Sequence, residues 1–218
     1  AARLTANGLF NDLRVRSSVR GAASGAVVDV DLDGAVRRKG EMTQVTLRPS
    51  GAVAGATLGA RAPVDISFAP AGATARADLT LGDGALRLDY GETRDALRLS
   101  ARLDNAPLAP IAAVLGEEAT GRVTGTLQAS GDGALEGDAD LTITDALFAR
   151  RARDPVTMQL SGRIDKGAMT LRASATSRNG LEAALDANAP VAARARPLRI
   201  ALAGEGQATW RAKGPADA

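Results

Sequence analysis

The chain has 218 residues, 45% of them hydrophobic, and its 27 basic and 25 acidic residues give a net charge of +2. The hydrophobic content is typical of a globular chain rather than a disordered one, and the balanced charge argues against nucleic-acid binding, which needs a concentrated basic face. Cysteine and histidine are both absent, which excludes disulfides, thiol nucleophiles, histidine bases and the usual zinc ligands.

Alternation with a period of two residues dominates the chain and is typical of strands with one apolar and one polar face. Clear alternation predicts strands at 28–33, 79–81, 86–90, 97–104, 156–161, 169–174 and 198–202. Weaker candidates lie at 13–19, 45–47, 64–68, 123–127, 141–143 and 181–185. We interpret 51–62 as a weak strand or a loop, and 189–197, which contains two prolines, as a loop.

Glycine-containing turns separate these strands, at 82–84, 131–133, 165–167 and 178–180. Strand starts recur about every 10 to 15 residues, which favours consecutive antiparallel strands over strand-helix-strand units. One segment departs from the pattern. Apolar residues at 108, 111, 114 and 115 have helical spacing, and Asn105 and Gly116 suit its two ends. We predict one short helix near 107–116, which either covers one end of the sheet or simply connects two strands.

The sequence offers no residue set suited to catalysis, and we predict no enzyme activity, no cofactor and no metal. Asp29, Asp31 and Asp33 resemble the start of a calcium loop, but apolar residues lie between them and residue 40 is glycine rather than the required glutamate. We interpret these aspartates as a solvated strand face.

An apolar sheet face must be covered, by a second sheet, by closure into a barrel, or by a ligand in a groove. Only five aromatic residues occur, whereas sandwich cores and the girdles of membrane barrels are rich in them. An aliphatic groove explains this composition best. The predicted fold is therefore all-β: a long antiparallel sheet curled into an open, taco-like half-pipe with an apolar interior and one short helix. We expect 1–218 to form a single groove unit that belongs to a longer protein.

The residues predicted to line the groove and bind lipid share the apolar phase of the strand pattern. They are Leu86, Leu88, Leu97, Leu99, Leu103, Val123, Leu127, Leu141, Ile143, Met158, Leu160, Met169, Leu171, Leu198, Ile200 and Leu202.

Three consecutive segments resemble a repeating unit of the AsmA/TamB-type family. They are the Leu-rich segment 107–116, the Gly-x-Val-x-Gly-x-Leu pattern within 119–131, and the Leu-x-Gly-x-x-x-Leu pattern within 135–143. Residues 5–15 are similar to the linking strands of this family, whereas the proline usual after the Gly-Thr strand is replaced by 131–133, Gly-Asp-Gly.

This resemblance implies a periplasmic segment of a protein anchored in the inner membrane of a diderm bacterium. It implies that phospholipid acyl chains bind in the groove during transport towards the outer membrane. A TamA-like outer-membrane barrel is the implied protein partner, through a role in outer-membrane protein assembly. The residues leave other readings open: a structural or adhesive β-stalk of a secreted protein, and a chaperone groove for unfolded β-strands.

Overall fold

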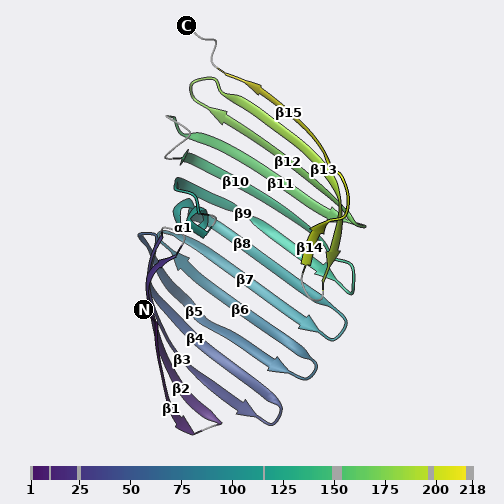
Figure 1. Cartoon of the computed structure of the whole chain (residues 1–218). Coiled ribbons are helices and arrows are strands. Elements are labelled where there is room, and N and C mark those ends of the chain that lie inside the picture. Colours follow the sequence, from purple (N-terminus) through teal and green to yellow (C-terminus); the bar gives the residue numbers. More distant parts are fainter. Residues whose placement is uncertain are drawn as a thin grey trace.

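The computed structural model describes residues 2–9, 11–23, 26–114, 116–148, 154–195 and 199–214, and it confirms the predicted open, all-β antiparallel sheet. One sheet of 15 strands carries one short helix (Figure 1). Strands β1 to β14 neighbour one another in chain order, and β15 pairs with the first half of β13. The strands are β1 (Ala2–Leu9), β2 (Asp12–Ala23), β3 (Ala26–Lys39), β4 (Met42–Val53), β5 (Ala56–Ala69), β6 (Gly72–Leu81), β7 (Gly84–Thr93), β8 (Leu97–Pro107), β9 (Ala119–Gly131), β10 (Glu136–Phe148), β11 (Val156–Asp165), β12 (Ala168–Ser177), β13 (Glu182–Arg194), β14 (Arg199–Leu202) and β15 (Gln207–Lys213).

The four predicted glycine turns all join consecutive strands, and the strands extend further than the clean alternation indicated. Segment 51–62 belongs to β4 and β5, which turn at residues 54–55. The prediction of a loop at 189–197 is wrong for its first part, because β13 continues to Arg194. Pro190 is tolerated there since the chain bends and changes its pairing partner from β15 to β14 at this point.

The predicted helix is present as α1 (Leu108–Val114). Asn105 does not cap it, which corrects the sequence interpretation. This residue lies inside β8 with φ of 48° at a break in the β8–β9 register. Such a bulge bends the strand end, and here the chain leaves the sheet directly into α1.

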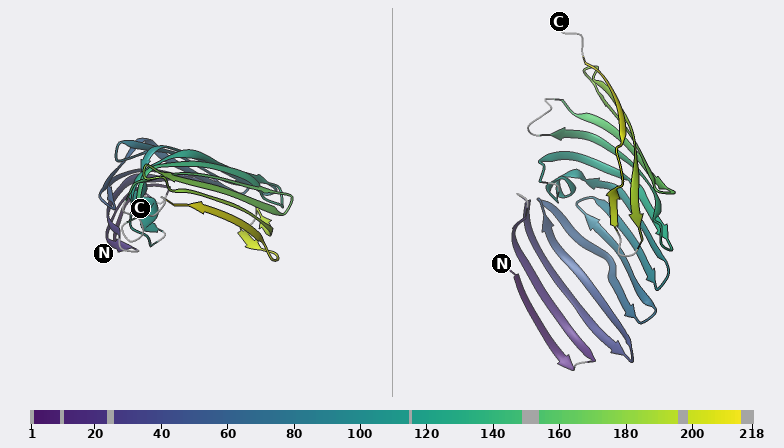
Figure 2. Two further views of the ribbon diagram at one scale, coloured as in Figure 1. Left: turned by 90° about the horizontal axis from the view of Figure 1, so that it is seen from above. Right: turned by 45° about the vertical axis from the view of Figure 1, so that its right-hand side comes forward.

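Two glycines illustrate how neighbouring strands approach closely on the inner side of the sheet. A Cβ atom placed on Gly34 or on Gly125 would lie 2.1 Å from a carbonyl oxygen of the adjacent strand, that of Thr46 or Asp140. Glycines of this kind allow a sheet to bend sharply. Seen from above, the sheet is an arc with α1 on its concave side (Figure 2).

The molecule is a single layer. Its accessible surface is 14308 Å², whereas a compact protein of its mass of 22.1 kDa exposes about 9,300 Å². Among the described residues, no large side chain is fully buried. In the described part of the chain, no second sheet therefore packs against either face of this layer.

Candidate functional site

The apolar face of the sheet is the candidate site, and strand register defines it. Residues directly opposite one another on neighbouring strands share a face. One such row crosses the sheet from β7 to β13: Leu88, Ala101, Leu127, Ala139, Gly162, Leu171 and Ala187. Parallel rows continue the face through the N-terminal strands, for example at Val36, Val45 and Ile66. The apolar face is thus continuous over the whole sheet.

Charge is almost absent from this face. Among the paired strand positions that the structure describes, only Arg38 and Glu92 are charged and lie on it. Both lie in the row nearest the hairpin turns at one side of the sheet. Arg38 donates a hydrogen bond to the carbonyl oxygen of Gly40, and Glu92 accepts one of 2.6 Å from the hydroxyl of Tyr90. The interior rows carry no charged side chain in these described pairs.

Fifteen of the sixteen residues predicted to line the groove lie on this single face, and Leu198 falls outside the described residues. The face also includes residues that the prediction omitted, such as Val36, Val45, Ile66 and Ala101. Alternation in the first five strands could have identified the N-terminal ones. Ala101 was missed because alanine gives a weak apolar signal.

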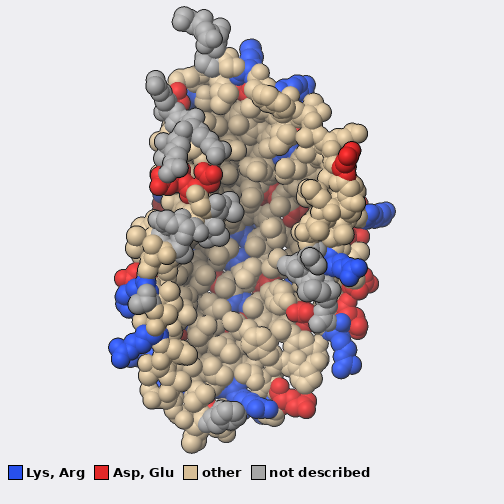
Figure 3. Space-filling model, in the orientation of Figure 1, with Lys and Arg blue, Asp and Glu red and all other residues tan. Residues whose placement is uncertain are grey.

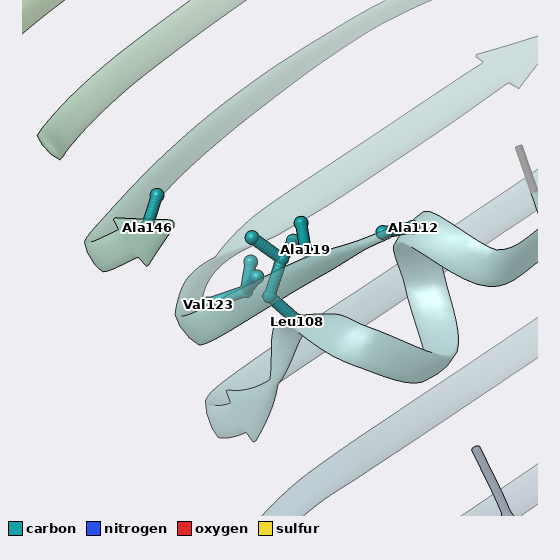
Figure 4. Close-up of a cluster of buried hydrophobic side chains, with 5 residues drawn as sticks. All are labelled: Leu108, Ala112, Ala119, Val123 and Ala146. Atoms are coloured by element: carbon teal, nitrogen blue, oxygen red, sulfur yellow. The ribbon is translucent and has the colours of Figure 1, made fainter. Parts of the chain in front are cut away.

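Helix α1 covers one part of the face. Leu108 and Ala112 of the helix pack with Ala119 and Val123 of β9 and with Ala146 of β10 (Figure 4). Partly buried Leu103, Leu141 and Ile143 pack against this cluster. A seven-residue helix is not stable alone, so this apolar contact holds it on the sheet.

A second cover lies near the opposite ends of the same strands. It consists of Val191–Ala195 and the turn Gly133–Leu135, and we call it the flap. The amide of Leu135 donates to the carbonyl of Ala193, and the amide of Ala195 donates to that of Gly133, both at 3.1 Å. Leu135 and Ala195 bury Leu97, with Tyr90, Leu99 and Ala129 partly buried against them.

The rest of the apolar face is open. Large hydrophobic side chains remain exposed from the first strands to the last: Leu4, Val19, Phe68, Leu127, Ile200, Leu202 and Trp210. In the view towards α1, most charged side chains lie around the outline and the middle is mainly uncharged (Figure 3). Exposed apolar patches of this extent mark interaction surfaces.

The opposite, charged face is a ladder of cross-strand ion pairs. Arg76 pairs with Asp89 at 2.7 Å, and this carboxylate raises the pKa of Arg76. The Arg122 guanidinium donates to Asp83 and holds the pKa of that carboxyl below its ordinary value. Further pairs are Arg16–Asp33, Arg20–Asp29, Arg20–Asp31, Arg37–Asp12, Arg87–Asp78 and Arg172–Asp186. The aspartates 29, 31 and 33 thus lie on the solvated face and pair with arginine.

A trough of about 1490 Å³ runs across this charged face from β4 to β12. Acidic, basic and hydroxyl side chains line it, and Leu99 is its one member from the predicted groove set. No group of three acidic side chains able to hold a metal ion occurs in the described part of the chain. We place the candidate site on the apolar face, because large hydrophobic side chains are exposed there.

Comparison with known proteins gives no relative. The sequence matches no family model, and no curated protein and no solved structure is similar to it. The described part of the chain also contains no helix long and apolar enough to cross a membrane. The chemistry of the site follows from its geometry: a concave, nearly uncharged, mainly aliphatic surface that can exclude water from an apolar ligand.

Proposed function

We propose that the apolar face binds the acyl chains of phospholipids and shields them from water while they move between two membranes. The observation that supports this most strongly is the continuous, nearly uncharged apolar face left open on the concave side of the sheet. Each methylene removed from water is worth about 0.8 kcal/mol. About ten buried methylenes would give about 8 kcal/mol, and the entropy cost of association brings the net affinity to weaker than micromolar. Binding of this strength is reversible, as a carrier requires.

The size of the face suits this role. With strands about 4.8 Å apart, the sheet measures about 60 Å in the direction in which its strands stack. One leaflet of hydrocarbon is about 15 Å deep, so several acyl chains fit end to end. No chemical step is needed for transfer, and we propose a carrier without enzyme activity.

The resemblance to AsmA/TamB-type repeats extends the proposal to a cellular setting. In this setting the chain is a periplasmic segment of a longer protein anchored in the inner membrane of a diderm bacterium. Its cargo is phospholipid bound for the outer membrane, and a TamA-like barrel is its proposed partner in outer-membrane protein assembly. The three matching segments contribute α1, β9 and β10, which are the elements that contact one another around Val123.

The proposal is tested by adding a charge to either face at neighbouring positions of β9. Leu127 is exposed on the apolar face, and Gln128 is exposed on the charged face. We expect Leu127→Arg to weaken acyl-chain binding around β9 by at least about tenfold, because a desolvated charge opposes binding there by more than 1.4 kcal/mol, and so to remove the phospholipid held at that position. Gln128→Arg should keep the phospholipid held around β9 and bind as much in total as the unmodified chain. Native mass spectrometry and lipid extraction measure both.

Equal lipid loading in the two variants would contradict the assignment to the apolar face. An unmodified chain that stays free of lipid and buries this face against a second copy would instead favour a structural stalk.

A further inference from the structure

We infer that the tightest acyl-chain site lies across the middle of β8 and β9, with Ala101 and Leu127 as its floor. This inference rests on the proposed function and locates it within the apolar face. The two covers, α1 and the flap, approach the same pair of strands from opposite ends. Along β8, Leu97 and Leu99 pack in the flap cluster and Leu103 packs against the α1 cluster, which leaves Ala101 between them.

Strand β9 repeats this arrangement. Val123 is buried beneath α1, and Ala129 packs against the flap cluster. Leu127 lies between them with 38% of its surface exposed. It is directly opposite Ala101 on β8 and Ala139 on β10. The two covers therefore act as side walls, and these small and aliphatic residues form the floor between them.

The span between the walls accommodates an acyl chain. Leu99 and Leu103 are four residues apart on β8, which is about 13 Å along a strand, and Val123 and Ala129 are six residues apart on β9, which is about 20 Å. A single extended acyl chain is narrower than either span. Because the walls lie at the strand ends, the chain must run across the strands.

The chemistry of the floor agrees with this occupant. None of the residues at the floor can hydrogen-bond through its side chain, and on the flap side the Tyr90 hydroxyl donates to Glu92. An acyl chain here contacts aliphatic groups on three sides, whereas elsewhere on the open face it contacts only the sheet. The contact area per methylene is therefore greatest at this site.

The test uses a phospholipid whose acyl chain carries a diazirine, with the cross-linked residues mapped by mass spectrometry. We expect cross-links at 101 and 127 in the unmodified chain. Ala101→Trp fills the floor, and its cross-links at 127 should fall by about tenfold, the factor that losing two buried methylenes gives. Cross-links on the outer parts of the face, at Phe68 and Met158, should persist in this variant. Ser100→Trp, on the charged face, is the matched control and should leave the pattern unchanged.

The outcomes separate this inference from the proposed function. Cross-links at Phe68 and Met158 without any at 101 or 127 would overturn the inference and leave the proposed function standing. Cross-links on neither part of the apolar face would overturn both. If Ala101→Trp fails to fold, Leu135→Ala tests the side wall that the flap forms. This variant should lower cross-linking at 127, while cross-linking at Phe68 persists. Unchanged cross-linking at 127 in a folded variant would contradict the inference.

Discussion

Replacing Gly125 with alanine is expected to destabilise the fold by about 3 kcal/mol or more, at the upper end of what overpacking costs. The new Cβ would lie 2.1 Å from the carbonyl oxygen of Asp140 and 2.8 Å from the Cα of Leu141. Both contacts are with the backbone of β10, so no rotamer change relieves them. Urea unfolding monitored by circular dichroism measures the effect.

Gly91 provides the matched control. It is also inside a strand, β7, but a Cβ there would meet no atom within 4 Å. We expect Gly91→Ala to change the free energy of unfolding by less than about 0.5 kcal/mol. Similar losses in both variants would mean that strand glycines act through general flexibility and not through close approach of the strands.

Shortening Leu97 to alanine is expected to cost about 3 kcal/mol, as for other buried leucines. Leu97 is 2% exposed, and with Leu135 and Ala195 it anchors the flap to the sheet. Loss of this anchor should release the flap before the sheet unfolds. Hydrogen exchange should therefore accelerate at the amides of Leu135 and Ala195, which hydrogen-bond across the flap.

The control for this prediction is Leu202→Ala in β14. Leu202 is 69% exposed, so its truncation leaves no cavity and should change stability by less than about 0.5 kcal/mol. Exchange at Leu135 and Ala195 should stay as in the unmodified chain. A uniform acceleration of exchange across all strands in Leu97→Ala would contradict a local role for the flap.

Period-two alternation was sufficient to predict the sheet and the side of each strand on which the apolar residues lie, whereas its open form was predicted from the scarcity of aromatic residues. A one-residue slip exchanges the two faces of a strand, so the charged and apolar residues of one strand constrain its register with the next. For example, Arg76 and Asp89 pair on one face while Ala75 and Tyr90 share the other. Such pairs made the face assignment predictable without any knowledge of the curvature.

Other features depended on contacts that are distant in the sequence. The bulge at Asn105 was read as a helix cap because both sites favour asparagine, and the distinction depends on its pairing with β9. The flap was missed because its strand, the second half of β13, contains a proline and alanines with no alternation. Its position over Leu97 arises from a contact between β13 and the β9–β10 turn, about 60 residues earlier.

The charged face offers an apolar ligand much less binding energy than the apolar face does. Its ion pairs are exposed, and pairs of this kind contribute only about 0–1 kcal/mol each. They keep that face solvated and help to set strand register. The free-energy gain available to a ligand therefore lies on the apolar face, where water has no polar partner to contact.

Tryptophan fluorescence quenching by phospholipids with brominated acyl chains tests the central claim most directly. The natural tryptophan, Trp210, is removed as Trp210→Phe, and a new tryptophan is placed either at Leu127→Trp on the apolar face or at Gln128→Trp on the charged face. We predict strong quenching at position 127 and none at position 128, although the two residues are neighbours in the chain. Equal quenching at both positions, or quenching at neither, would contradict acyl-chain binding on the apolar face.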